Sequence, residues 1–233
     1  MVHWKNLQKK LLGEKNRMNL AKGSKPWIHS AFLAGIIFFI LFFIFIDRFI
    51  GIIFLFLSIF VFLKAIFLIQ FFRDPDRVIG EGIVACADGK VREISSIKDI
   101  EVGNCTKIST FMNIYNVHVN RIPLEGTVKD IIHIKGIHLP AFKKESEKNE
   151  RVVTTIDTKI GTVKVIQIAG TIARRIIPYI KKGDNLKKGD KIGIIRFGSR
   201  VDIYLPTKKI KKILVKVGDI IKAGETTIAE TND

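Results

Sequence analysis

The chain has 233 residues and a formal net charge of +17, from 39 lysines and arginines against 22 acidic residues, a length that allows one or two domains. A nucleic-acid partner is not expected, because no interleaved aromatic platform or zinc-finger spacing accompanies the basic charge. The only two cysteines, Cys86 and Cys105, lack C-x-x-C spacing, which indicates reduced thiols in a cytosolic domain and no metal site.

The first elements in chain order are a basic segment and an apolar one. Residues 1–26 carry seven lysines and arginines against Glu14 alone, and residues 27–72 are nearly all Ile, Leu, Phe, Val and Ala. A bilayer core of about 30 Å needs about 20 apolar residues as a helix. Residues 27–72 therefore predict a transmembrane helical hairpin that turns at Asp47 and Arg48. A buried core hairpin is the alternative, but this segment has no polar face for solvent.

Charge predicts the orientation of this hairpin. Basic flanking segments stay in the cytoplasm, so residues 1–26 are expected there. Two crossings return the chain to the same side, which places residues 73–233 on the cytoplasmic side of the cell membrane. Residues 73–233 carry a formal charge of +10, which would draw them to an anionic bilayer. A lysine-rich solvated surface explains the same charge equally well.

Residues 73–233 predict one mainly β domain. Short runs of Ile and Val, such as "GTVKVIQIAG" and "DKIGIIRF", are separated at close intervals by Gly, Asp, Asn and Pro. This spacing is typical of a β-sandwich or barrel rather than of alternating strands and helices. Residues 139–151 are polar and charged, and we expect a short helix or an exposed loop there.

An internal repeat lies near the C-terminus. Residues 180–195, "IKKGDNLKKGDKIGII", align without gaps on residues 215–230, "VKVGDIIKAGETTIAE". The Gly-Asp and Gly-Glu pairs predict turns that need a positive φ. Twin hairpins of this kind resemble those of the biotinyl/lipoyl-like β-sandwiches. A modifiable lysine beside methionine at a hairpin tip is missing, so this resemblance supports the fold alone.

Six ordered segments carry a second resemblance. They are "FFRDPDR" (Phe71–Arg77), "ADGKV" (Ala87–Val91), "FMNIYNVHVNRIP" (Phe111–Pro123), "NERVVTTI", "QIAGTIARRI" and "RFGSRVDIYLP". Together they resemble the phosphatidylserine decarboxylase family in its short archaeal and bacterial form. The resemblance covers residues 71–206, and the apolar hairpin before them also fits the family.

This resemblance gives "GS", Gly198-Ser199, a meaning that the pair would not have alone. In the family, the hydroxyl of the serine attacks the carbonyl of the glycine, and the chain cuts itself between the two residues. The C-terminal chain then begins with a pyruvoyl group derived from Ser199, which forms a Schiff base with the substrate amine. Neither a metal nor pyridoxal phosphate is implied. The implied product is the ethanolamine lipid, made from phosphatidylserine or archaetidylserine, and the two cleavage chains form a heterodimer.

The resemblance also assigns proton transfer to His118, whose imidazole titrates near neutral pH. It assigns Asp88 the orienting role of a triad acid, although an isolated Asp-Gly pair is most simply a turn. Longer family members have a second histidine three residues after His118, where this chain has Arg121. Because arginine stays protonated, the maturation base is left open between His118 itself and another group such as His133 or His138.

Three arginines are candidate substrate ligands. Arg121 could bind the lipid phosphate or the substrate carboxylate in a bidentate manner, and Arg196 and Arg200 flank the cleavage bond. Strand alternation alone does not tell whether these two side chains face that bond.

Two other readings compete with the decarboxylase. A non-enzymatic membrane adaptor with a biotinyl/lipoyl-like β-sandwich would explain the repeat and the anchor, but it predicts a long heptad hairpin that the sequence lacks. An inactive family member would bind lipid and stay uncut, although Gly198, Ser199 and His118 are all present. A homo-oligomer is left open by the sequence.

Overall fold

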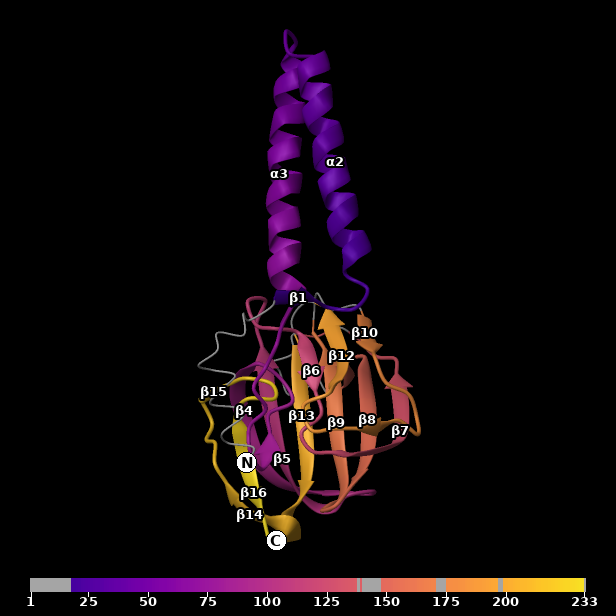
Figure 1. Ribbon diagram of the computed structural model, residues 1–233, viewed down its shortest axis with the longest axis vertical. Coiled ribbons are helices and arrows are strands. Elements are labelled where there is room, and N and C mark those ends of the chain that lie inside the picture. The colour runs from indigo at the N-terminus through magenta and orange to yellow at the C-terminus, as the bar shows by residue number, and fades with distance from the viewer. Residues whose placement is uncertain (1–17, 138, 140–147, 171–174, 197–198, 233) are drawn as a thin grey trace. The chain divides into compact units, whose positions relative to one another are not determined.

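The computed structural model describes residues 18–137, 139, 148–170, 175–196 and 199–232 (Figure 1). The chain divides into two compact units. One unit ends at Pro75 and contains both long helices, and the other begins at Asp76 and is built from strands.

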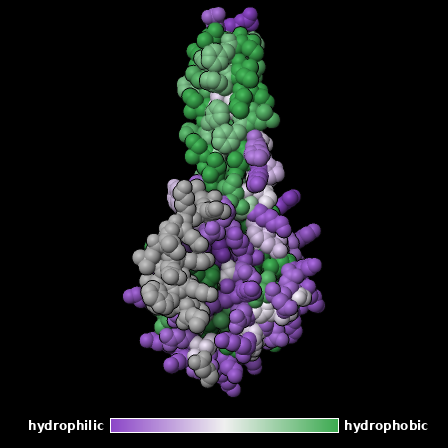
Figure 2. All heavy atoms as spheres, viewed as in Figure 1, coloured by the Kyte–Doolittle hydropathy of each residue, from purple (hydrophilic) through white to green (hydrophobic). Residues whose placement is uncertain are grey.

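The helical unit consists of two antiparallel helices, α2 (Lys25–Ile44) and α3 (Phe49–Phe71), with the short strands β1 (Met18–Leu20) and β2 (Arg73–Pro75) paired at its open end. Both helices are long and apolar enough to cross a membrane, and only 17% of the apolar window of each is buried. Hydrophobic side chains accordingly cover this unit (Figure 2). The predicted apolar hairpin therefore exists, with its turn at Asp47 and Arg48.

Small residues line the contact between α2 and α3. Ala31 and Gly35 on α2, and Ser58 and Ala65 on α3, are buried. The Ser58 hydroxyl donates a hydrogen bond to the Gly35 carbonyl at 3.0 Å, and a Cβ at Gly35 would lie 3.0 Å from the Phe62 ring. Close approach through small residues, with a polar group bonded across the interface, is typical of helices packed in a bilayer.

The second unit is mainly β, as predicted. Its strands are β3 (Ile83–Val84), β4 (Gly89–Asp99), β5 (Gly103–Met112), β6 (Val119–Arg121), β7 (Gly126–Ile134), β8 (Arg151–Thr158), β9 (Gly161–Ala169), β10 (Arg175–Pro178), β11 (Asn185–Leu186), β12 (Lys191–Arg196), β13 (Ser199–Pro206), β14 (Ile210–Ile213), β15 (Ile220–Ile221) and β16 (Thr227–Thr231).

One large sheet and two small ones enclose the core of this unit. The large sheet has the order β11-β7-β8-β9-β13-β5-β4-β15, and the small sheets have the orders β10-β12-β6 and β14-β16-β3. All these strand pairs are antiparallel. Apolar side chains from the large sheet, such as Val165 and Val201, share one buried cluster with Ile192 and Ile195 of β12 and with Ile228 of β16. The core is therefore the space between the large sheet and the two small ones.

The internal repeat folds into turns of one geometry. Asp184, Asp190 and Asp219 each accept a hydrogen bond from the backbone N–H three residues earlier, at 2.9, 2.7 and 2.9 Å. The glycine before each aspartate has a φ of 88°, 88° and 104° respectively, a conformation that other residues rarely adopt. The Lys-x-Gly-Asp pattern thus encodes the turn, as predicted. The expected helix or loop at residues 139–151 falls mostly outside the described residues.

Candidate active site

The Gly198-Ser199 pair lies where the chain passes between two sheets. Strand β12 of a small sheet ends at Arg196, and β13 of the large sheet begins at Ser199. Only residues 197 and 198 connect them, and both lie outside the described residues. The cleavage pair therefore lies at the crossing from one sheet to the other and not within a single strand.

Ser199 opens a strand that is paired on both sides. Its Cα partners are Met112 on β5 and Ala169 on β9. Side chains of directly opposed residues point to the same face of a sheet, and Met112 and Ala169 both belong to the buried core. Ser199 is accordingly 0% exposed, and its hydroxyl donates to the Met112 sulfur at 3.2 Å.

His118 enters the same interior from the opposite layer. It directly precedes β6, and its carbonyl accepts a hydrogen bond from the N–H of Ile195, a core residue. The imidazole is fully buried, and its Nδ1 lies 2.9 Å from the carbonyl oxygen of Asn116. Because a carbonyl only accepts hydrogen bonds, Nδ1 must carry the proton in the neutral ring. Nε2 is then the basic nitrogen.

Asp88 is held in a turn by two hydrogen bonds. Its Oδ2 accepts from Arg77 Nη2 at 2.9 Å, and its Oδ1 accepts from the N–H of Ala223 at 2.8 Å. Among the described residues, neither Ser199 nor His118 is hydrogen-bonded to this carboxylate. The residue after Asp88 must be glycine, because a Cβ at position 89 would lie 2.1 Å from the carbonyl oxygen of Phe111.

Two of the three candidate arginines, Arg121 and Arg200, lie on strand faces turned away from Ser199. Arg200 follows Ser199 in an extended strand, so its side chain lies on the other face of β13, where it binds Asp202 at 2.9 Å. Arg121 alternates in the same way with Asn120 on β6 and donates to the carbonyl of Gly189 at 2.9 Å. Arg196 ends β12 opposite Arg175, and burial and the Arg175 charge lower its pKa. The structure thus does not bring the guanidinium groups of Arg121 and Arg200 beside the hydroxyl.

One of the two other histidines also lies apart from Ser199. His133 on β7 is half exposed, and its Nε2 lies 2.8 Å from Glu150 Oε1. Strands β8 and β9 separate β7 from β13, which corresponds to about 14 Å. His138 falls outside the described residues. Of His118 and His133, only His118 is buried.

Several residues that sequence reasoning missed belong to this site. Arg77 holds Asp88, and Met112 accepts from Ser199. Two buried amides, Asn120 and Gln167, are hydrogen-bonded to each other at 2.8 Å. The only available signal for the last two was their place in the segments "FMNIYNVHVNRIP" and "QIAGTIARRI". In the described part of the chain, no group of three or more His, Cys, Asp or Glu residues could hold a metal ion.

Comparisons with known proteins decide the family. The family model described as phosphatidylserine decarboxylase matches residues 65–229, which is more than half of the chain. The chain belongs to the phosphatidylserine decarboxylase family. The match confirms the family that the six segments resemble. Its members are decarboxylases, which are carboxy-lyases.

Individual relatives of this decarboxylase family member cover most of its length. A phosphatidylserine decarboxylase proenzyme of Streptomyces avermitilis is 51% identical over 162 residues, 69% of this chain and 73% of the relative. A protein of Methanococcoides burtonii with the provisional name archaetidylserine decarboxylase proenzyme is 50% identical over 167 residues, 70% of this chain and 75% of the relative. A Methanosarcina barkeri protein with the same provisional name is 40% identical over 214 residues, 90% of this chain and 98% of the relative.

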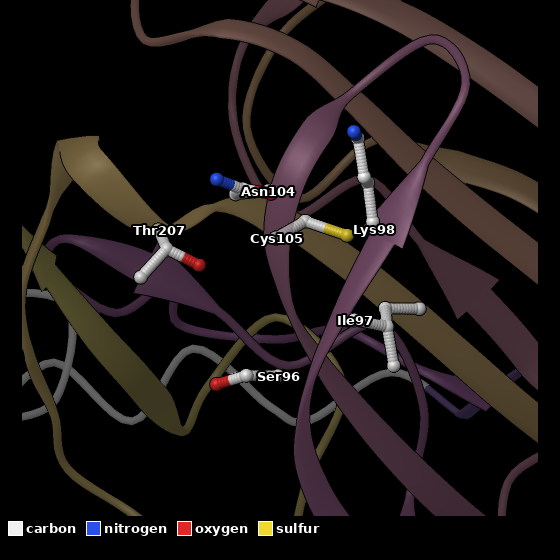
Figure 3. A pocket seen from close by; sticks show the side chains of 6 residues that line it. All are labelled: Ser96, Ile97, Lys98, Asn104, Cys105 and Thr207. Atoms are coloured by element: carbon white, nitrogen blue, oxygen red, sulfur yellow. The ribbon is translucent and has the colours of Figure 1, made fainter.

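A solvent-facing hollow of this family member lies far from Ser199. It has a volume of about 290 Å³ and is lined by Ser96, Ile97, Lys98, Asn104, Cys105 and Thr207 (Figure 3). Cys105 pairs with Pro206 at one end of the β5–β13 ladder, whereas Met112 pairs with Ser199 at the other. Seven residues of strand separate the two places, about 23 Å. A ligand in this hollow would not reach the serine.

The face of β13 opposite to Ser199 carries a buried ion pair between Arg200 and Asp202. Arg200 and Asp202 side chains are 8% and 2% exposed, and Ser109 lies directly across on β5. Burial raises the pKa of the Asp202 carboxyl, and the charges of Arg200 and Lys107 only partly offset this.

Asp202→Asn is expected to make the free energy of unfolding depend less steeply on pH above about pH 4. Since the pKa of Asp202 is higher in the folded chain, the folded chain binds this proton more tightly. Its contribution to the free energy of unfolding is therefore most favourable below the unfolded-state pKa of about 4 and declines as pH rises through the folded-state pKa. Denaturant unfolding in detergent at a series of pH values above 4 measures the slope. Parallel curves for the two proteins would contradict the assignment.

Proposed function

We propose that the protein is a membrane-anchored decarboxylase that cuts itself between Gly198 and Ser199 and then converts a phosphatidylserine-type lipid into the ethanolamine lipid. One observation carries the proposal: Ser199 is fully buried at the start of β13, and its side chain faces the same interior as His118. Membership of a decarboxylase family favours this function over a membrane adaptor.

The proposed maturation has three successive steps. Ser199 Oγ forms a bond to the carbonyl carbon of Gly198, the C–N bond breaks, and the amide becomes an ester with a free amine. A base removes the Ser199 α-proton, and β-elimination releases Gly198 as a carboxylate. Water then converts the remaining dehydroalanine to pyruvoyl and ammonia. Serine is a weak nucleophile that needs a base, and the Nε2 of His118 is the proposed one.

The fold explains how two chains would stay together after the cut. The C-terminal chain, residues 199–233, begins with β13, which is paired along its length with β5 and β9. Its later strands pair with β3 and β4 of the other chain. Separating the chains would remove an inner strand of the large sheet, so we propose a stable heterodimer.

Position 199 suits a pyruvoyl group. When formed, this group supplies a carbonyl that accepts electrons from the substrate, the task that pyridoxal phosphate performs in other decarboxylases. The site is buried among Met112, Ala169 and the core, which separates it from bulk solvent. His118, with its ring fixed by Asn116, can bring a proton in through Nε2.

The remaining candidate residues take supporting roles in this proposal. Asp88 is an orienting carboxylate, and each of its oxygens keeps a second lone pair for an imidazole. Arg121 and Arg196 are proposed to bind the phosphate or carboxylate of the substrate. Arg200 is a third candidate. To bind the substrate, Arg121 would have to leave the Gly189 carbonyl, and Arg200 would have to leave Asp202. The twin Lys-x-Gly-Asp turns support a biotinyl/lipoyl-like origin for this part of the fold.

The membrane hairpin suits a substrate that stays in a bilayer. We propose that α2 and α3 anchor the protein in the cell membrane with its β unit on the cytoplasmic side. The basic charge would attract anionic head groups there. Anchoring replaces a three-dimensional search by one within the membrane plane, which raises the effective concentration of substrate.

Vesicles test the proposed function directly. The purified protein is incubated with vesicles of diacyl phosphatidylserine or of its ether-linked isoprenoid counterpart, and lipids are identified by mass spectrometry. We expect loss of carbon dioxide from at least one lipid to give the ethanolamine lipid. No product from either vesicle, with the protein folded and membrane-bound, would overturn the proposal.

A further inference from the structure

A chain of polar contacts runs from Ser199 into the apolar core. The Ser199 hydroxyl donates to Met112 Sδ at 3.2 Å, and Asn120 Nδ2 donates to the same sulfur at 3.6 Å. Gln167 Nε2 donates in turn to Asn120 Oδ1 at 2.8 Å. Met112 and Asn120 are both fully buried, and Gln167 is 1% exposed. These hydrogen bonds therefore link Ser199 to three strands of the two facing layers, β5, β6 and β9.

Gly193 leaves the space that the Asn120–Gln167 amide pair occupies. A buried amide without a partner destabilises the fold, whereas an apolar pair would need no partner at all. Opposite Asn120 on β12 stands Gly193, where a Cβ would lie 3.2 Å from Gln167 Nε2 and 2.7 Å from a backbone oxygen. The absence of a side chain at position 193 thus lets the Gln167 amide reach Asn120.

Met112 can orient the serine hydroxyl without reacting with it. A thioether sulfur accepts hydrogen bonds, but it has no proton to give and is only a weak acceptor. Contact with it holds the oxygen in place. Because the sulfur is only a weak acceptor, the O–H can turn from it to a base when the oxygen attacks. The flexible methionine is held in turn by the donor from Asn120, which Gln167 fixes.

We propose that Met112, anchored by the Asn120–Gln167 amide pair, positions the Ser199 hydroxyl for its attack on the preceding carbonyl. Met112 touches the reacting oxygen, whereas Asn120 and Gln167 act through Met112 and are positioning residues. This role rests on the proposed self-cleavage and concerns its first step, the formation of the ester. It leaves removal of the proton to a base such as His118, two residues before Asn120.

Met112→Leu removes the sulfur while keeping the volume of the side chain. Cores tolerate such swaps at nearly constant volume, so the fold should persist. Ile108→Leu is the matched control, since Ile108 is fully buried on the same strand and faces the same core. We expect M112L to cut at least about tenfold more slowly, as misplacement of a reacting group can cost about 100-fold. I108L should cut at the wild-type rate.

A double variant separates positioning from stability. Gln167→Met alone leaves the Asn120 amide without its partner, whereas Asn120→Leu with Gln167→Met replaces both by apolar side chains of similar shape, which can be nearly neutral. We expect N120L/Q167M to recover the unfolding midpoint that Q167M loses, yet to cut as slowly as M112L. Recovery of both stability and cutting in the double variant would reduce the pair to a structural role.

Hydroxylamine identifies the step that fails. It splits an ester into a hydroxamate and a free alcohol, so it cuts any chain in which Ser199 has already attacked. Uncut M112L and N120L/Q167M chains, followed on denaturing gels, should resist it. Rapid cutting by hydroxylamine, or cutting of both variants at the wild-type rate, would overturn the positioning role alone. A wild-type chain that never cuts would overturn the proposed function and this role with it.

Discussion

Ser199→Ala is expected to leave a single uncut chain of 233 residues that has no decarboxylase activity. The substitution removes the proposed nucleophile and the atom from which the pyruvoyl group derives, so neither maturation nor turnover can proceed. The fold should survive, because the hydroxyl makes its described hydrogen bond to a sulfur, a weak acceptor. Denaturing gels and the vesicle assay measure both losses.

Ser109→Ala is the matched control for that experiment. Ser109 is also a buried serine, 1% exposed, on the strand next to β13. It lies opposite Asp202, whose side chain is on the other face of β13 from Ser199. S109A should therefore cut and turn over normally. A cut S199A chain would show that the cleavage does not depend on the Ser199 hydroxyl. An uncut S109A chain of normal stability would show that the loss of cutting is not specific to Ser199.

Arg77→Met is expected to lower the free energy of unfolding by about 3–5 kcal/mol. The Arg77 guanidinium, 5% exposed, bridges Asp88 at 2.9 Å and Glu225 at 3.0 Å. Since the Asp88 side chain is only 10% exposed, removing Arg77 would leave a buried charge without its counter-ion. Denaturant unfolding of the detergent-solubilised protein measures the loss.

Two further variants interpret that loss. Lys222→Met removes an exposed cation, 64% exposed, that lies 3.6 Å from the same Glu225, and an exposed pair contributes at most about 1 kcal/mol. Adding Asp88→Asn to R77M removes the unpaired charge, so the double variant should lose less than the sum of the two single variants. Equal losses for R77M and K222M would contradict the importance of the buried pair.

Local patterns predicted the parts of the fold that depend on neighbours in sequence. The apolar run at residues 27–72 indicated two helices because no polar face interrupts it, and the Lys-x-Gly-Asp repeat indicated turns because only glycine readily adopts the required φ. The orientation of Arg200 was left open. It followed only once β13 was seen to begin at Ser199, because neighbours in an extended strand lie on opposite faces.

Contacts between distant strands could not be predicted in this way. Arg77 meets Glu225 across 148 residues, and Gln167 meets Asn120 across 47. The first pair depends on the pairing of β16 with β3, and the second on the packing of β9 against the small sheet that contains β6. Side-chain periodicity carries no information about either arrangement. The polar surroundings of Ser199 therefore became visible only when the two layers were seen together.

The intact mass of the purified wild-type protein tests the central claim most directly. Under denaturing conditions we expect two chains, one ending at Gly198 and one of the 35 residues 199–233, the latter lighter by one ammonia than a chain that starts with serine. Under native conditions the two should travel as one complex. A single uncut chain of full mass, persisting after incubation with lipid vesicles, would contradict the account.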